Sequence, residues 1–524
     1  MKRGRVDGGI SRDEYERDAD TTGSRNGYEN PVEEAQRAPD HVLRSRKIYT
    51  NVTTKEQEYH RHLGALNKAF AATLKRQWSS NKHGDWHENM KEYLQFVRDI
   101  EAKFGCARGK VLTFGSGDCG QLAHGVEEDD DMMVKFPRIV SMLQHKQVVR
   151  VACGGLHSAA VTQDGEVYTW GCNDDGALGR TGEENLPAKV EGFGPDQVCV
   201  VQVVGGDCHT AVVTLAGQVY TWGSYKDKEG KLWCDAASAK EAFKQKQVRP
   251  FLHTTLSNIV DLRCGSTFNI ARTNDGRVYS WGLGEMGQLG RKVITEMKDD
   301  KDQYKTELVF QQHLMPGLVT LGSDVLPPVK AIGCGSYHSL FALSSNGYLY
   351  TCGLNNYGQL GIGSTENCDT LHLVDDLTDK NVAQVEGGTH HSVVLTNDGD
   401  VYALGRADSG QLGMMDTCKT GDFKDRPQHV KFPCSNSNES VVIRMISCGS
   451  NHAIALSEAN EVYSWGYGDM LALGNGVEQD EPKPKKIDWA KTHFGDAEVL
   501  QVEAGGQHSA ILAVKKDGSA TMYA

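Results

Sequence analysis

The sequence has no long run of apolar residues. Hydrophobic residues make up 39% of its 524 positions and charged residues 24%. Nowhere do the roughly 18 consecutive apolar residues of a membrane-spanning helix occur. The first ten residues are basic and rich in glycine, with no apolar stretch behind them, so no secretory signal is expected. These absences predict a protein without a membrane span or a membrane partner.

Paired cysteines and hydrolase motifs are also missing. The 14 cysteines stand singly, and no Cys-x-x-Cys pair occurs, which argues against a zinc ribbon or a thiol redox motif. There is no Gly-x-Ser-x-Gly elbow, no Ser/His/Asp order and no dense cluster of metal ligands. We therefore expect no covalent catalysis, no cofactor and no metal site.

Charge is unevenly distributed along the chain. Residues 1–110 contain 21 Lys and Arg against 17 Asp and Glu, a net charge of +4, whereas the total is −13, which leaves −17 for the remainder. An acidic body binds DNA poorly without specific contacts and suits basic protein surfaces better.

A short β-prone strand that ends in glycine recurs seven times, at intervals of 52 to 71 residues. In most copies a Gly-x-Leu-Gly signature follows, as at Gly176–Gly179 and Gly287–Gly290. The seven copies are Val111–Gly115, Val167–Gly171, Val219–Gly223, Val278–Gly282, Leu349–Gly353, Val401–Gly405 and Val462–Gly466. Such periodicity is typical of proteins built from structural repeats.

A second unit, a Gly-x-x-His turn before an apolar strand, also occurs seven times. In most repeats an Asp-Gly or Asn-Gly turn then leads into the next glycine-ended strand, which is a strong hairpin signal. The copies begin at Gly154, Gly206, Gly265, Gly335, Gly387, Gly449 and Gly505, with Phe268 replacing the histidine in the third. Blades of four short strands, each too small to bury its own faces, predict an all-β, seven-bladed propeller over residues 109–515. Because the array opens on one unit and ends on the other, strands from both ends should share the closing blade.

These signatures, with Gly171–Arg180, resemble the regulator of chromosome condensation family. Its members are seven-bladed propellers, and its founding branch is the guanine nucleotide exchange factor for the small GTPase Ran. The resemblance covers nearly 80% of the chain. It implies a Ran exchange factor that acts in nucleocytoplasmic transport and is located in the nucleus, with a monomer expected.

One blade departs from the repeat in a way that points to this branch. After Gly223 the Gly-x-Leu-Gly signature is replaced by a charged segment. In the exchange factors of the family this place holds a protruding hairpin, the β-wedge, that presses on the GTPase. The alternative is an ordinary charged surface loop. The predicted wedge consists of Tyr225, Lys226, Asp227, Lys228, Glu229, Gly230, Lys231 and Leu232.

The resemblance also implies a Ran-binding face. The matching positions are Asp118, His157, Asp207, Arg291, His390 and His508. A ring of histidines could also suggest a metal, but one equivalent histidine per blade is better explained as a repeated packing or hydrogen-bonding residue. Thr267 stands where the family has an Asp that contributes to exchange, so we expect Ran binding with weakened exchange.

Chromatin binding is an open alternative within the same resemblance. Family members that bind nucleosomes use a basic N-terminal tail and an Arg-bearing loop after the fourth glycine-ended strand. Here that loop, residues 292–316, contains no Arg, whose planar guanidinium an acidic patch normally requires. A nucleosome partner therefore stays a weaker expectation than Ran.

The first hundred residues divide into two parts. Residues 1–53 are polar with mixed charge and should be disordered, and Lys2, Arg3 and Arg5 form a candidate import signal. Residues 54–104 show helical spacing of Tyr59, Leu63, Leu66 and Phe70, and again from Tyr93, which predicts two amphipathic helices. Residues 516–524 form a C-terminal tail.

The N-terminal part resembles a second family, the fifty-kilodalton nucleoporins. The similarity lies in Met1–Arg5, Ala38–Ile48 and the spacing Tyr59, Leu63, Leu66 and Phe70. It implies importin-α binding through residues 1–104. The alternative is that the helices cap the propeller.

Other branches of the propeller family fit less well. The light-sensing branch carries Gly-Trp-Arg-His-Thr repeats, which are absent here, and the ubiquitin-ligase branch appends a catalytic domain that we do not expect. The remaining alternative to an exchange factor is a non-catalytic scaffold that binds Ran or importin-α at chromatin or the nuclear pore.

Overall fold

The computed structural model describes residues 108–516, apart from 126–127, 129–131, 196, 227–231, 234–245, 293–312, 417–418, 434–439 and 493. Several predictions lie outside the described residues: the tail 1–53 with Lys2, Arg3 and Arg5, the helices of 54–104, and all but the first residue of the tail 516–524. The wedge residues Asp227 to Lys231 and most of the loop 292–316 also lie outside them.

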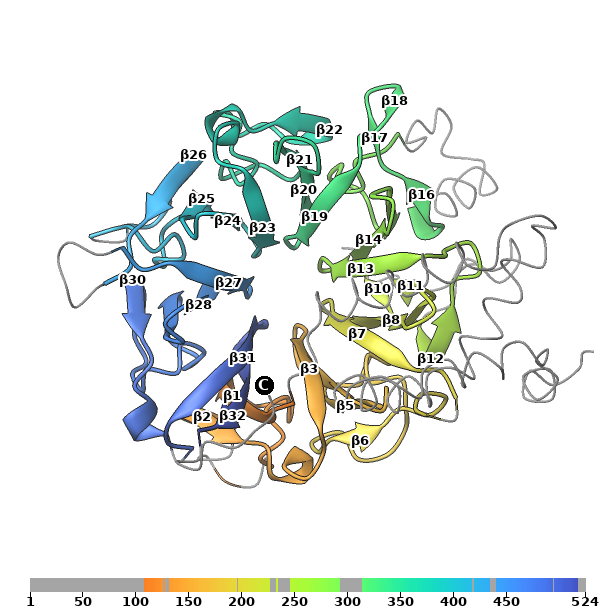
Figure 1. The fold of residues 1–524 in the computed structure, drawn as a ribbon, viewed down its shortest axis with the longest axis vertical. Helices are drawn as coiled ribbons and strands as arrows, with labels where there is room; N and C mark the ends of the chain where they lie inside the picture. The colour runs from red at the N-terminus through yellow and green to blue at the C-terminus, as the bar shows by residue number, and fades with distance from the viewer. Residues whose placement is uncertain are drawn as a thin grey trace, which may run out of the picture. The chain divides into compact units, whose positions relative to one another are not determined.

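Seven four-stranded antiparallel sheets surround a central channel, with one strand of each nearest the axis (Figure 1). This confirms the predicted propeller. From the axis outward, blade 1 contains β3 (Val148–Cys153), β4 (His157–Thr162), β5 (Val167–Gly171) and β6 (Ala188–Lys189). Blade 2 contains β7 (Val200–Gly205), β8 (His209–Thr214), β9 (Val219–Gly223) and β12 (Gln247–Leu252). Blade 3 contains β13 (Ile259–Cys264), β14 (Phe268–Thr273), β15 (Val278–Gly282) and β16 (Gly317–Leu318). Blade 4 contains β19 (Val329–Cys334), β20 (His338–Leu343), β21 (Leu349–Gly353) and β22 (Cys368–Leu373). Blade 5 contains β23 (Val382–Gly387), β24 (His391–Thr396), β25 (Val401–Arg406) and β26 (Phe423–Val430). Blade 6 contains β27 (Ile443–Cys448), β28 (His452–Ser457), β29 (Val462–Gly466) and β30 (Glu481–Lys486).

Blade 7 joins the two ends of the repeat array, as predicted. Its inner strands are β31 (Ala497–Ala504) and β32 (His508–Lys515), and its outer strands are β1 (Lys110–Ser116) and β2 (Met133–Ile139). Strand β1 pairs with β32 from Lys110 opposite Ala513 to Gly115 opposite His508. This pairing leaves neither strand as an unpaired edge.

The described part also contains two small ladders and three 3₁₀ helices. The ladders pair β10 (Tyr225–Lys226) with β11 (Leu232–Trp233), and β17 (Thr320–Leu321) with β18 (Asp324–Val325). The 3₁₀ helices are η1 (Ser141–Leu143), η2 (Asp375–Leu377) and η3 (Trp489–Lys491). No helix of the described residues has the length and apolar character needed to cross a membrane.

The glycine that ends each third strand is required by its backbone conformation. All seven have φ between +101° and +116°, a region that disfavours residues with a Cβ. A Cβ on Gly171 would also lie 2.6 Å from the carbonyl oxygen of Leu156. The repeated glycine therefore brings the following loop against the Gly-x-x-His turn of the same blade.

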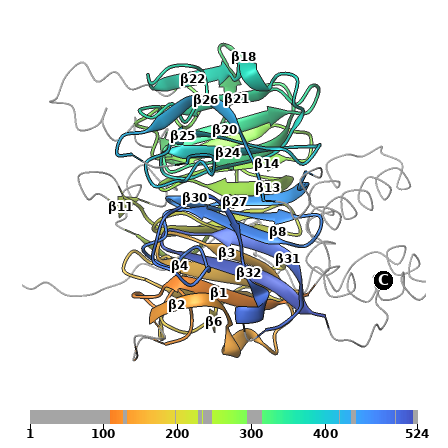
Figure 2. The same cartoon turned by 90° about the vertical axis from the view of Figure 1, so that its left-hand side faces the viewer.

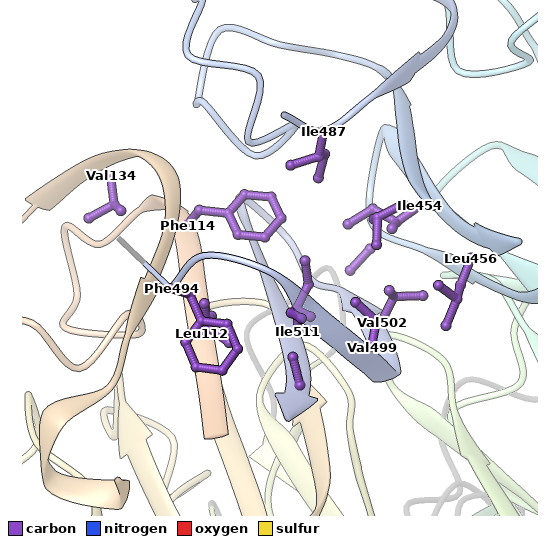
Figure 3. Packing of buried hydrophobic residues seen from close by; sticks show 14 of the residues in the cluster. Leu112, Phe114, Val134, Ile454, Leu456, Ile487, Phe494, Val499, Val502 and Ile511 are labelled. Atoms are coloured by element: carbon purple, nitrogen blue, oxygen red, sulfur yellow. The ribbon is translucent and has the colours of Figure 1, made fainter. Parts of the chain in front are cut away.

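The hydrophobic core is divided among the seven joints between neighbouring blades, with one buried cluster at each. At the joint of blades 6 and 7, Phe114 from β1 packs with Ile454 from β28 and Ile511 from β32 (Figure 3). Each blade thus buries its faces only against its neighbours, which is the physical basis of the repeat.

Candidate partner-binding face

Antiparallel pairing brings two kinds of loop to the same end of every blade, which we call the loop face. The residue after each strand-ending glycine donates a backbone hydrogen bond to the carbonyl of the residue before the repeated histidine or Phe268. Four of these bonds are Cys172 N to Leu156 O, Ser224 N to Cys208 O, Leu283 N to Thr267 O and Leu354 N to Tyr337 O; the other three are Arg406 N to His390 O, Tyr467 N to Asn451 O and Ser116 N to Gln507 O, and all seven measure 2.8–2.9 Å.

This geometry corrects the register of the fifth Gly-x-x-His turn. The sequence suggested Gly387 to His390, but the closing bond runs from Gly388 N to His391 O, 2.9 Å, as from Gly154 N to His157 O in blade 1. His391 is therefore the repeated histidine. His390 precedes it and lies partly exposed on the loop face. Two adjacent histidines made the register ambiguous in the sequence.

The repeated histidines are core residues, and all but His391 bond to the next blade. Nε2 of each is 2.8–2.9 Å from a hydroxyl oxygen in four joints: His157 to Thr210, His338 to Ser392, His452 to Ser509 and His508 to Ser158. The expected hydrogen-bonding role is confirmed. His157 and His508 are only 1% and 0% exposed, so their prediction as partner contacts is wrong for this conformation.

Burial keeps these imidazoles neutral. Desolvation lowers the pKa of His157, His338, His391 and His508 from 6.5 to about 3. The hydroxyl of Ser158 donates to Gln121 O at 2.9 Å, so Nε2–H of His508 is the donor in their mutual bond.

The exposed chemistry of the loop face is mainly acidic. Asp118 and Asp207, two predicted contacts, are exposed there. Asp118 lies three residues after the strand-ending glycine, and the same position holds Asp174, Glu285, Asp408 and Asp469 in other blades. All but Asp408 are exposed. These five acidic positions were not predicted from the sequence, although their constant distance from the strand-ending glycine is visible there.

His390 belongs to an aromatic and charged group on blades 4 and 5. Its ring centroid is 5.1 Å from that of Tyr357, and the guanidinium of Arg406 lies 5.2 Å from the same tyrosine ring. Arg406 Nε is 2.7 Å from Asp408 Oδ1. Burial and the nearby Arg406 lower the pKa of His390, so it offers a neutral ring at pH 7.

Arg291 stabilises its own loop rather than presenting its charge. Its Nε donates to Ser280 Oγ at 3.2 Å, and Nη2 donates to Met315 O at 3.1 Å. Burial lowers its pKa to about 10. Arg180, at the same position of blade 1, donates to Thr169 O and Leu186 O. The prediction that Arg291 contributes to the partner face is therefore not supported by its contacts.

A hairpin begins on the loop face where the wedge was predicted. Tyr225 pairs with Trp233 and Lys226 with Leu232, and β11 lies at the left-hand side of the stacked sheets in Figure 2. Tyr225 is fully buried, which corrects its prediction as a contact residue, whereas Lys226 is exposed. Tyr225 is thus the buried first residue of the hairpin, which we call the hairpin root.

The central channel contains charged side chains of both signs around a cavity of about 270 Å³. Arg263 of blade 3 reaches Glu386 of blade 5, with Nη1 to Oε1 at 2.9 Å. Burial, together with Glu386, raises the pKa of Glu503 to about 7. Burial also raises the pKa of the thiols of Cys153, Cys334 and Cys448 at the rim, so they remain protonated. Within the described ranges, no three His, Cys, Asp or Glu residues are arranged to hold a metal ion.

Comparison with known proteins now adds to this geometry. The model of the RCC1-like domain matches residues 110–511. The chain belongs to the RCC1 family. It is 34% identical over 421 residues to the human regulator of chromosome condensation, covering 78% of this chain and 92% of the human protein. It is also 32% identical over 403 residues to the ultraviolet-B receptor UVR8 of Arabidopsis thaliana, covering 76% of this chain and 80% of the receptor.

Solved structures of the yeast RCC1, Prp20, are similar as well. A crystal structure of Prp20p from Saccharomyces cerevisiae, described with its binding properties to Gsp1p and histones, has a TM-score of 0.67 and 28% identity, covering 79% of this chain and 93% of that one. Another, with Kap60 bound to Prp20, has a TM-score of 0.67 and 27% identity, covering 80% and 92%. The RCC1-family fold of this chain is thus shown by sequence and structure, while its partners are matters of proposal.

Proposed function

We propose that this RCC1-family protein is a guanine nucleotide exchange factor for Ran, which it binds through the loop face. The observation that carries the proposal is the hairpin β10–β11. It replaces the Gly-x-Leu-Gly loop of blade 2 and begins at Tyr225, directly after Ser224. The backbone amide of Ser224 donates to the carbonyl of Cys208, the neighbour of the exposed Asp207. A hairpin beside an acidic face is what a wedge-bearing exchange factor requires.

The proposed activity breaks no covalent bond. An exchange factor binds the nucleotide-free GTPase more tightly than the nucleotide-bound form and thereby shifts the population toward release. The exposed carboxylates Asp118, Asp174, Asp207, Glu285 and Asp469 would steer a basic GTPase surface onto the loop face. The neutral ring of His390 and the stacked pair of Tyr357 and Arg406 offer contacts of the kind enriched in protein interfaces.

The test is the release of a fluorescent GDP analogue (mant-GDP) from Ran. The unaltered protein should accelerate release by about tenfold or more. A variant in which residues 227–231 are shortened to two glycines leaves the residues of the β10–β11 ladder unchanged, and it should lose most of that acceleration. Insertion of two residues in the turn of β17–β18, an exposed hairpin on the connection between blades 3 and 4, serves as the control and should have no effect. No acceleration by the unaltered protein would refute the exchange activity.

The alternative is a scaffold that binds Ran or importin-α without promoting exchange. Thr267, which is 7% exposed at the position where the family has an exchange-promoting Asp, favours this alternative. The two functions separate in one experiment, because a scaffold would bind Ran without changing the release rate. If exchange is merely weakened, Thr267→Asp should raise the release rate several-fold.

The remaining partners follow from the relatives. The complex of Prp20 with Kap60 and the binding of Prp20p to histones support importin-α and chromatin as partners. The name of the relatives, regulator of chromosome condensation, supports a nuclear location. A pull-down with importin-α should be lost when residues 1–53 are deleted. A nucleosome gel shift across a salt series tests chromatin binding, and no shift at low salt would exclude it.

A further inference from the structure

The joints between blades share a hydrogen-bond arrangement on the loop-face side. At the joint of blades 7 and 1, Ser158 Oγ accepts from His508 and donates to Gln121 O at 2.9 Å, and Trp170 Nε1 donates to the same carbonyl at 2.9 Å. At the joint of blades 1 and 2, Thr210 Oγ1 and Trp222 Nε1 both donate to Ala177 O, at 2.8 and 2.7 Å. The carbonyl comes from the loop of the preceding blade, so one short hydroxyl side chain attaches both the histidine and the loop to the next blade.

The joint of blades 2 and 3 differs because the hairpin replaces the loop that would provide this carbonyl. Trp281 occupies the position of Trp170 and Trp222, and its Nε1 is buried without a hydrogen-bond partner. The Ser or Thr position holds Asn269. Its Oδ1 is 3.1 Å from His209 Nε2, and its Nδ2 donates to Tyr225 Oη at 2.8 Å.

Asn269 has the reach and the functional groups that this joint requires. Its side chain is longer than Ser or Thr and carries a separate acceptor and donor, so it can bond His209 and Tyr225 at once. Tyr225 and Asn269 are both 0% exposed, and the Tyr225 ring lies 4.9 Å from that of His209. A buried amide group without hydrogen-bond partners is costly, so Asn269 suits this joint because His209 and Tyr225 are both there to bond it. The amide–phenol bond replaces the lost loop contact and attaches the hairpin root to blade 3.

We propose that Asn269 and Tyr225 are positioning residues, which set the orientation of the hairpin strands β10 and β11 by fixing the first strand to the joint between blades 2 and 3. This inference rests on the proposed exchange function. Neither side chain can touch the partner, because both are buried. They act through the paired strands β10 and β11, so their loss should reduce exchange without reducing the loop-face contacts that bind Ran.

Two variants remove the attachment and keep the joint. Asn269→Ser introduces the residue found at Ser158, Ser392 and Ser509, which can still bond His209 but is too short for Tyr225. Tyr225→Phe keeps the buried ring and removes the hydroxyl. Ser392→Ala is the matched control, since it breaks the bond to His338 at the same position of blade 5.

The measurement is mant-GDP release from Ran over a range of protein concentrations, together with thermal unfolding. For Asn269→Ser and Tyr225→Phe we expect the release rate at saturation to fall about fivefold or more, because small misplacements of an acting group are costly, with less than about a twofold change in half-saturating concentration. Ser392→Ala should lower the unfolding temperature and leave the saturating rate unchanged. Saturating rates of both variants within about twofold of the unaltered protein would overturn the inference, while the exchange function would stand.

A second measurement does not depend on Ran. Amide hydrogen exchange of residues 225–226 and 232–233 in the free protein should become faster in both variants, and not in Ser392→Ala. If the unaltered protein released no nucleotide, faster amide exchange in both variants would still support the attachment. Unchanged amide exchange in these strands would overturn it.

Discussion

Three joints of the propeller depart from the common arrangement, and two of them, between blades 2 and 3 and between blades 5 and 6, do so in contrasting ways. Between blades 2 and 3 the loop carbonyl is lost, and Asn269 replaces the hydroxyl residue and bonds both His209 and Tyr225. Between blades 5 and 6 the hydroxyl is lost by substitution with Ala453, and neither ring nitrogen of the buried His391 has a partner. A replacement that forms new bonds keeps the buried polar groups of the joint paired, whereas a replacement that leaves them unpaired lowers stability.

The common arrangement also explains which changes the propeller tolerates. In the third blade Phe268 occupies the place of the histidine, and its ring lies as close to Gly265 as that of His391 lies to Gly388. Ser339 of the next blade keeps its bond to Gln288 O at 2.6 Å. The position therefore accepts an apolar ring when the neighbouring hydroxyl keeps its carbonyl acceptor.

Acid should have the largest effect on stability, because it acts on every buried histidine together. Burial lowers the pKa of His209 and His452 to about 4 and that of four others to about 3, against 6.5 when exposed. Above pH 6.5 both the folded and the unfolded states are neutral at these positions. Below it the unfolded chain binds protons first, so the free energy of unfolding should fall by up to about 1.4 kcal/mol per pH unit for each histidine.

Urea unfolding between pH 8 and pH 5 measures this dependence. The midpoint should fall only slightly from pH 8 to 7, where protonation of Glu503 in the folded state opposes the effect, and should fall steeply below pH 6. His391→Phe serves as an internal control, since it removes one titrating group and should make the fall shallower. A midpoint that stays constant down to pH 5 would contradict neutral buried histidines.

The next largest effect concerns the channel side of the joint between blades 5 and 6. There Gln384 Nε2 donates to Ile446 O at 2.8 Å, and Ile446 N donates to Gln384 Oε1 at 3.1 Å. Gln384→Met leaves both backbone groups without these bonds and should cost about 3 kcal/mol. Since this joint lacks the histidine bond, it should also open more readily.

Gln501 is a matched control, because it makes the same two bonds to Val151 at a joint that keeps its histidine bond. Gln501→Met should be less destabilising than Gln384→Met by about 1 kcal/mol, since His508 still holds the blades together. Chemical unfolding of both variants gives the comparison. Equal costs would mean that the histidine bond contributes nothing to the joint.

A third test makes the same His→Phe substitution at two joints. His508→Phe removes the bond to Ser158 and should cost about 2 kcal/mol. His391→Phe removes a histidine that has no partner and introduces the ring that blade 3 accepts, so it should raise stability. Opposite shifts in unfolding temperature are the expected result. Two shifts of the same sign would show that ring size, and not hydrogen bonding, decides this position.

How far the sequence predicted these features depends on whether they repeat. Two signatures with seven copies each predicted the number of blades and the closure by β1 and β32, because each copy meets the same steric requirements. Features present once were harder. The Asn269–Tyr225 bond joins residues 44 positions apart, and no repeat signals it. The adjacent pair His390 and His391 fits the pattern in two registers, and only strand pairing distinguishes them.

The burial of side chains was the other limit. His157, His508 and Tyr225 lie at the loop face by their position in the chain, but their side chains turn into the joints. Arg291 has the sequence context of a surface residue, and its guanidinium bonds carbonyls of its own loop. The direction of a side chain at a loop depends on the packing of neighbouring blades, which one blade's sequence does not contain.

The smallest expected effect is the repair of the joint between blades 5 and 6. Ala453→Ser places a hydroxyl opposite His391, where Ser392 stands opposite His338 and Ser509 opposite His452. A serine there can accept from His391 and donate to Gln411 O, which already accepts from Trp465. Stability should rise by about 1 kcal/mol.

A double-mutant cycle with His391→Phe makes this prediction specific. If the gain comes from the new bond to His391, Ala453→Ser should give little in the His391→Phe background, because a phenyl ring offers no donor. An equal gain in both backgrounds would mean that the serine acts only through the Gln411 carbonyl. His391 would then contribute nothing to the joint between blades 5 and 6. The contrast between the two joints would rest only on the bonds that Asn269 makes between blades 2 and 3.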